Sequence, residues 1–140
     1  MTRRAIADTG PLVAFLDRAE RHHRWVSRTV QELEAPLLVC EPVLAEAMFL
    51  LARASKGQDA LFGLLENGAL RLTLHLDEHI AALRSLHRKY QDRPMSLADA
   101  CVVRMAELHE RHAVLTLDSD FTIYRKRDGG QLALIMPDAG

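Results

Sequence analysis

Four carboxylate side chains stand at positions where a soluble protein usually places apolar residues. Asp8 and Asp118 each end a short apolar run, and Glu46 and Asp99 fall on the apolar side of helical patterns. Removing water from an unpaired carboxylate is costly, roughly several kcal/mol, so acids normally stay on wet surfaces. Four such acids from distant parts of one chain suggest a shared partner, and the simplest partner is a hard divalent cation.

The chemistry of such a set is that of a metal-dependent enzyme. Ligands made only of oxygen suit Mg²⁺ or Mn²⁺, whereas zinc would call for Cys or His. A bound cation of this kind lowers the pKa of a water molecule, orients a phosphate and neutralises charge on a leaving oxygen. Two cations about 4 Å apart would share these tasks, and one cation with a Lys or Arg is the alternative.

Each acid also has a purely structural explanation. Asp8 and Asp118 can cap the turn or helix that follows a strand. Asp99 lies three residues after Ser96, as in a capping box. Glu46 is the hardest to explain this way, because its helical neighbours are all apolar; the alternative is a place at the edge of the apolar stripe, with its carboxylate in water. Those neighbours are Pro42, Val43, Phe49 and Leu50. Asp120 is a fifth acid, either in the site or at its rim.

Short apolar runs alternate along the chain with longer helical patterns. Strands are expected at residues 4–7, 36–40, 70–74, 113–117 and 132–136. Helices are expected at residues 11–18, 22–33, 42–54, 58–67, 77–90 and 96–111, with Asp77 and Ser96 as the caps of the last two. This alternation predicts an α/β fold, a three-layer α/β/α sandwich around a mostly parallel sheet. Ligands of such sheets bind at the carboxyl ends of the strands, where Asp8 and Asp118 are expected.

The length and charge of the chain limit the partners that it can have. A chain of 140 residues with 49% hydrophobic and 26% charged residues predicts a single domain spanning residues 1–140. The net charge of −1 provides no general attraction for nucleic acid, so RNA binding needs a local patch or a bound metal. Arg125, Lys126 and Arg127 are the candidate patch, with a solvated basic turn as the alternative. Arg104 lies about 140° around the helix from Asp99 and is expected on the surface.

Cysteine usage and hydropathy indicate the compartment. Cys40 and Cys101 lie in apolar surroundings and are expected as buried thiols in a reducing compartment, not as a disulfide. No signal-peptide pattern is present, and no apolar run approaches the roughly 20 residues needed to cross a bilayer. We therefore expect a cytoplasmic protein with no membrane partner.

Four segments together resemble the successive motifs of the PIN-domain family. They are Ile-Ala-Asp-Thr-Gly at 6–10, Pro-Val-Leu-Ala-Glu at 42–46, Met-Ser-Leu-Ala-Asp-Ala at 95–100 and Leu-Thr-Leu-Asp-Ser-Asp-Phe at 115–121. More narrowly, the chain resembles the compact VapC-type ribonuclease toxins of bacterial toxin–antitoxin pairs. The resemblance runs from residue 6 to the tail. One departure is Glu41-Pro42, where many relatives begin a helix with Ser or Thr; it affects the helix cap and not the acids.

The resemblance implies an α/β/α sandwich that binds Mg²⁺ or Mn²⁺ and hydrolyses RNA to 5′-phosphate and 3′-hydroxyl ends. The positions that match the family's four acids, as catalytic residues and metal ligands, are Asp8, Glu46, Asp99 and Asp118. Thr9 and Thr116 match hydroxyl positions that support the acids, and Asp120 matches a position that is often acidic. The resemblance also implies a cognate VapB-like antitoxin and a homodimer.

Other classes fit the sequence less well. Residues 8–10 match the Asp-Thr-Gly tripeptide of aspartic proteases, but that fold is all-β and most of this chain is helical. Phosphoacceptor and haloacid-dehalogenase-like enzymes also place an Asp after the first strand, but the latter normally have a second Asp where this chain has Gly10. Two alternatives remain within the PIN family: a housekeeping nuclease in RNA processing, and a non-catalytic scaffold that binds RNA or protein. The scaffold predicts missing acids, and none is missing.

Overall fold

A single all-parallel sheet organises the chain. The computed structural model describes residues 3–138 and contains five strands in the order β3-β2-β1-β4-β5. The strands are β1 (Arg4–Ala7), β2 (Leu37–Val39), β3 (Leu70–Leu72), β4 (His112–Leu115) and β5 (Leu134–Ile135). The helices are α1 (Thr9–Leu16), α2 (His23–Gln31), α3 (Glu41–Leu51), α4 (Gly57–Glu66), α5 (Ile80–Lys89) and α6 (Leu97–Leu108), with 3₁₀ turns η1 (Leu76–His79) and η2 (Ser119–Thr122).

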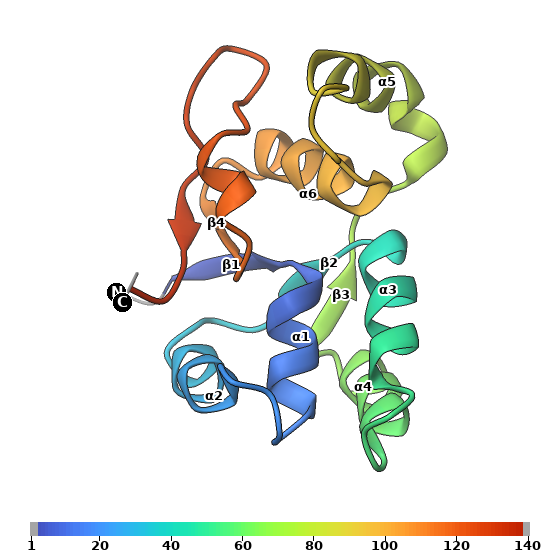
Figure 1. Cartoon of the computed structure of the whole chain (residues 1–140), viewed down its shortest axis with the longest axis vertical. Helices are drawn as coiled ribbons and strands as arrows, with labels where there is room; N and C mark the ends of the chain where they lie inside the picture. Colours follow the sequence, from blue (N-terminus) through green and yellow to red (C-terminus); the bar gives the residue numbers. More distant parts are fainter. Residues whose placement is uncertain (1–2, 139–140) are drawn as a thin grey trace.

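The helices form layers on both sides of this sheet. In Figure 1, α6 and α5 lie above β1, while α1, α2 and α4 lie below it. Helix α3 follows β2 and packs against both α1 and α6. The predicted three-layer α/β/α sandwich with a parallel sheet is therefore confirmed. No helix within residues 3–138 is long and apolar enough to span a bilayer.

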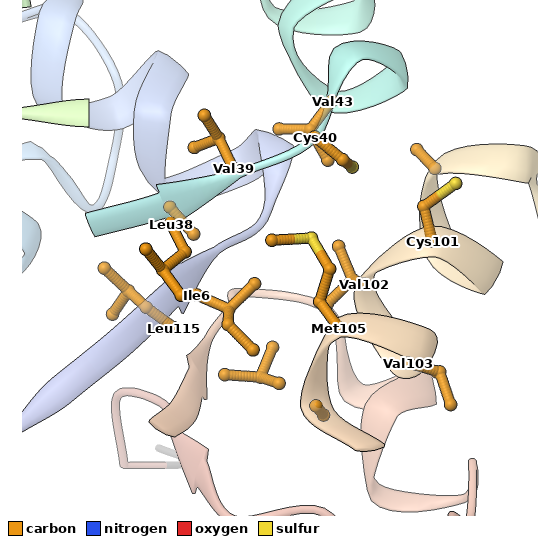
Figure 2. Close-up of a cluster of buried hydrophobic side chains, with 14 of the residues drawn as sticks. Ile6, Leu38, Val39, Cys40, Val43, Cys101, Val102, Val103, Met105 and Leu115 are labelled. Carbon is orange, nitrogen blue, oxygen red and sulfur yellow. The ribbon is translucent and has the colours of Figure 1, made fainter. Parts of the chain in front are cut away.

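The core between the sheet and α6 is built from aliphatic and sulfur-containing side chains. Met105 and Val102 of α6 lie close to Ile6 of β1 and Leu38 of β2 (Figure 2). Residues on the middle strands are buried on both faces, which explains why these strands read as continuous apolar runs.

Cys40 and Cys101 belong to the same core, at the start of α3 and in α6 (Figure 2). Both are free and fully buried, so the prediction of buried thiols is confirmed. Interaction with the Cys101 thiol, together with burial, raises the pKa of Cys40. Cys40 thus remains a protonated packing residue.

Two helix starts test the capping predictions. Ser96 Oγ accepts a hydrogen bond from Asp99 N at 3.0 Å, and Asp99 Oδ2 accepts one from Ser96 N at 3.2 Å, so the predicted capping box is present. The cap predicted at Asp77 is wrong: a 3₁₀ turn precedes α5, which begins at Ile80 without a side-chain cap. Likewise α3 has no side-chain cap, in keeping with Glu41-Pro42 at its start.

The pairing of β1 with β4 brings distant parts of the chain together. Ala7 lies in register with Leu115, and Asp8 N donates a hydrogen bond to Leu115 O at 3.0 Å. From β1 the sheet extends to β2 on one side and to β4 on the other, which makes this edge a topological switch point. The residues that follow β1 and β4, including Asp8 and Asp118, therefore meet at the carboxyl edge.

Candidate active site

A buried hydroxyl joins the ends of the two central strands. Thr116 is fully buried, and its Oγ1 donates to Asp8 Oδ2 at 2.8 Å while accepting a hydrogen bond from Asp118 N at 3.0 Å. Asp8 is only 6% exposed. It occupies the N-cap position of α1 but makes no side-chain capping bond there. The carboxylate of Asp8 is thus oriented by Thr116.

A second hydroxyl connects α1 to α3. Thr9 Oγ1 donates to Glu46 Oε2 at 3.0 Å, and Thr9 is itself buried. Glu46, however, is exposed, and so are its neighbours Phe49 and Leu50. The prediction that Glu46 lies on the buried face of α3 is therefore wrong. The buried stripe of α3 is the adjacent row Val43, Ala47 and Leu51, so apolar neighbours alone did not identify the face that packs inward.

Asp99 combines its capping role with a contact from the end of the chain. Besides the Ser96 amide, its Oδ2 accepts a hydrogen bond from the Tyr124 hydroxyl at 3.4 Å. Burial, and then the negative charge of Asp99, raises the pKa of Tyr124, so this hydroxyl stays protonated and donates. The Asp99 carboxylate can therefore cap α6 and belong to the acid cluster at the same time.

The four acids interact electrostatically. Burial raises the pKa of Asp8 to about 6, and the charges of Asp99 and Asp118 add to this effect against the hydrogen bond from Thr116. Burial also raises the pKa of Asp99, with contributions from Asp118 and Glu46. Like charges that shift one another's pKa lie near one another. Together with the hydrogen bonds that join Asp8 and Asp118 through Thr116 and connect Thr9 to Glu46, these interactions place the four acids, from four separate segments, in one region.

No Lys or Arg within residues 3–138 forms an ion pair with any of these four acids. The nearest pair is peripheral: Arg93 Nη1 lies 4.0 Å from Asp120 Oδ1, and both side chains are partly exposed. Asp120 N also donates to Asp118 Oδ1 at 2.9 Å. Asp120 therefore lies beside the cluster, and no ion pair within the described residues offsets the negative charge of the four acids.

The acids retain oxygen lone pairs for a further partner. Among residues 3–138, hydrogen bonds engage one oxygen each of Glu46 (Oε2), Asp99 (Oδ2) and Asp118 (Oδ1). In this conformation no three Asp, Glu, His or Cys side chains among residues 3–138 are arranged tightly enough to enclose one ion. The donor chemistry fits a hard cation, and coordination would require the carboxylates to draw closer together.

The predicted basic patch does not contact the acids. Arg125 Nη1 donates to the backbone carbonyl oxygens of residues 122–124, and its backbone N donates to Tyr90 Oη at 2.8 Å. Arg125 and Arg127 line a separate pocket, which Lys126 does not. Arg104 lines the same pocket. The Arg104 side chain is only 18% exposed, so the prediction of a surface position is wrong. The side chain points away from Asp99, as expected, but it packs toward α5.

The family model of the PIN domain matches residues 5–127. The chain belongs to the PIN-domain family. The matched range includes most of β1, all of β2 to β4 and all four acids. The PIN domain described above is also 33% identical, over 134 residues, to Ribonuclease VapC26 of Mycobacterium tuberculosis (strain ATCC 25618 / H37Rv); the similarity covers 93% of this chain and 98% of that protein.

Two residues near the acids of this PIN domain, Tyr124 and Arg93, were not identified from the sequence. Tyr124, fully buried, contacts Asp99 and packs edge-to-face against Tyr90 and Phe121, with ring centroids 5.0 and 5.2 Å apart. Arg93 reaches Asp120 from the break before α6. An aromatic residue four positions after Asp120 was the available signal for Tyr124, whereas only the tertiary fold places Arg93.

The raised pKa of Asp8 predicts a pH-dependent stability without divalent cations. Its pKa of about 6 exceeds the ordinary 3.8, so the folded state binds the proton more tightly than the unfolded state. The free energy of unfolding should therefore decrease as pH rises between these values, by about 3 kcal/mol in total. In urea denaturation with EDTA, Asp8→Asn should be more stable than wild type near neutral pH.

The difference should disappear at about pH 4, where wild-type Asp8 is protonated. Asp59→Asn, which changes an exposed acid of α4, is the matched control and should follow the wild type. A stability difference between Asp8→Asn and wild type that did not vary with pH would contradict the assigned environment of Asp8.

Proposed function

We propose that this PIN domain, residues 1–140, is a ribonuclease that hydrolyses RNA phosphodiester bonds with Mg²⁺ or Mn²⁺. The observation that carries the proposal is the group of four interacting carboxylates at the switch point of the sheet, with which no Lys or Arg among residues 3–138 forms an ion pair. Similarity to Ribonuclease VapC26 supports RNA as the substrate. A non-catalytic scaffold would not need to retain four such acids at one edge.

The roles of the side chains follow from their positions. Asp8, Asp99, Asp118 and Glu46 would hold the cation, with Asp120 at the rim. When bound, the cation would activate water and stabilise charge on the phosphate. Thr116 fixes the orientation of Asp8 and the backbone of Asp118, and Thr9 holds Glu46 toward α1. Tyr124 and Ser96 do the same for Asp99.

The bond changes are those of phosphodiester hydrolysis. The oxygen of water bonds to phosphorus, the bond from phosphorus to O3′ breaks, and the proton is transferred to O3′. The products carry 5′-phosphate and 3′-hydroxyl ends. The acids alone would repel the RNA backbone, so positive side chains nearby must help to hold it. Arg125, Lys126 and Arg127 remain our candidates for this task.

We further propose that the protein is the toxin of a type II toxin–antitoxin pair in the cytoplasm. Its full-length similarity to a VapC protein supports this role over a housekeeping nuclease. The partner would be a VapB-like antitoxin that covers the acids. Phe49 and Phe62, on α3 and α4, are 80% and 55% exposed and offer an apolar surface for a homodimer.

Asp99→Asn should abolish RNA cleavage, because it removes one carboxylate charge while an amide oxygen can still accept the capping bond. The measurement is cleavage of a labelled RNA with Mg²⁺ or Mn²⁺, and Asp59→Asn is the matched control. Mn²⁺ should raise the melting temperature of the wild type and of Asp59→Asn, but much less that of Asp99→Asn. Cleavage by purified Asp99→Asn at the wild-type rate would refute the assignment.

The toxin role predicts a growth phenotype that a housekeeping nuclease would not produce. Expression of the wild type in a bacterial host should arrest growth, and expression of Asp99→Asn at the same level should not. Co-expression of a small protein encoded beside this gene should restore growth. Normal growth despite demonstrated ribonuclease activity in the cell extract would instead favour the housekeeping role.

A further inference from the structure

A pocket of about 350 Å³ lies between α5, α6 and the loop at residues 125–127. Its lining combines the apolar residues Ala81, Ala82 and Leu86 with charged side chains. The positively charged lining residues are Lys89, Arg104, Arg125 and Arg127, and the negatively charged ones are Glu78 and Glu107. The pocket thus has a surplus of two positive charges in a protein whose net charge is −1.

Internal contacts fix part of this charge and leave the rest available. Arg104 donates to Glu107 Oε1 and to His79 Nδ1, both at 3.1 Å, and Arg127 N donates to Glu107 Oε2. These bonds pair the Glu107 carboxylate with Arg104 and connect the backbone of Arg127 to α6. The Arg127 guanidinium forms no ion pair with another described side chain. Lys89 likewise forms no ion pair among the described residues, and its Nζ lies over the Tyr90 ring, 5.4 Å from the centroid.

The pocket adjoins the acid cluster through two tyrosines. Arg125 N donates to Tyr90 Oη, the rings of Tyr90 and Tyr124 are in contact, and the Tyr124 hydroxyl donates to Asp99. Arg104 and Asp99 share α6, five residues apart, which corresponds to about 7.5 Å along the axis. Because Arg104 also lies about 140° around α6 from Asp99, a single strand of RNA with one phosphate at the acids would pass around this helix to reach the pocket.

We propose that this pocket binds a backbone phosphate of the RNA substrate, outside the bond that is cut; this rests on the proposed ribonuclease function. Guanidinium and ammonium groups are the usual protein ligands of phosphate. The described residues that line the pocket include no Phe, Tyr or Trp on which a base could stack. The pocket consequently recognises the backbone and not the sequence, and its cations offset the repulsion of RNA by the acids.

The test is binding of a fluorescently labelled single-stranded RNA, followed by anisotropy in EDTA so that cleavage does not interfere. Arg127→Gln should weaken binding roughly three- to tenfold, the effect of one charged hydrogen bond at a partly exposed site. The slope of log Kd against log salt concentration should also fall by about 0.7, as for one lost phosphate contact. Glu78→Gln removes the negative charge of an exposed residue of the pocket and should tighten RNA binding. A variant with a damaged fold would bind less tightly, so this result would exclude misfolding as the cause.

Two control variants separate the pocket from general charge. Arg24→Gln removes the same charge from an exposed position of α2 and should bind as the wild type does. Lys126→Gln removes a charge of the same basic segment outside the pocket, and it should weaken RNA binding less than Arg127→Gln does. Equal losses for Lys126→Gln and Arg127→Gln, or unchanged binding for both Arg127→Gln and Glu78→Gln, would overturn the proposal.

The outcomes also distinguish this inference from the proposed function. Wild-type cleavage of RNA with unchanged binding by the pocket variants would overturn the pocket alone. Failure of the wild type to bind or cleave RNA would overturn both. Inorganic phosphate, added at constant ionic strength, tests for a free anion as the ligand. If phosphate binds in a manner that requires Arg127 while RNA binding does not, the pocket serves a free anion and the RNA assignment is wrong.

Discussion

Parallel pairing of β1 with β4 is the constraint on which the arrangement of the acids depends. The register of Ala7 with Leu115 places Asp8 and Thr116 side by side, although 108 residues separate them in the chain. From that pair the site extends outward: Thr116 fixes the backbone of Asp118, and α1, which begins directly after Asp8, carries the Thr9 contact to α3. A shift of one residue in this register would separate the acids without altering their identity.

Placing these acids close together costs electrostatic free energy, which the rest of the fold must offset. Asp8 is buried near two other acids, and burial is the largest cause of its raised pKa. Neutral donors, rather than cations, orient the carboxylates: threonine and tyrosine hydroxyls and backbone amides. Neutral donors hold the acids in place without cancelling their charge. The charge therefore remains available to a cation, and the cations of the α5–α6 pocket lie apart from it.

Sequence reasoning recovered the layers, the parallel sheet and the elements that carry the acids, because strand and helix periodicities differ and strand ends bear the acids. It was wrong where the outcome depended on which of two helix faces packs inward. Glu46 is exposed although its neighbours are apolar, and Arg104 is half-buried although it is charged. Nor could local pattern predict that Tyr124 would reach Asp99, since only the tertiary fold brings them together.

The most direct test of the central claim is the pKa of Asp8, measured by NMR titration of carboxyl ¹³C in the absence and presence of Mg²⁺. We predict a value of about 6 without divalent cation, as burial and neighbouring acids require, and a marked decrease when Mg²⁺ is added, because a bound cation favours the charged form. An ordinary pKa near 3.8 that Mg²⁺ leaves unchanged would contradict the account of a buried, uncompensated acid cluster that binds a cation.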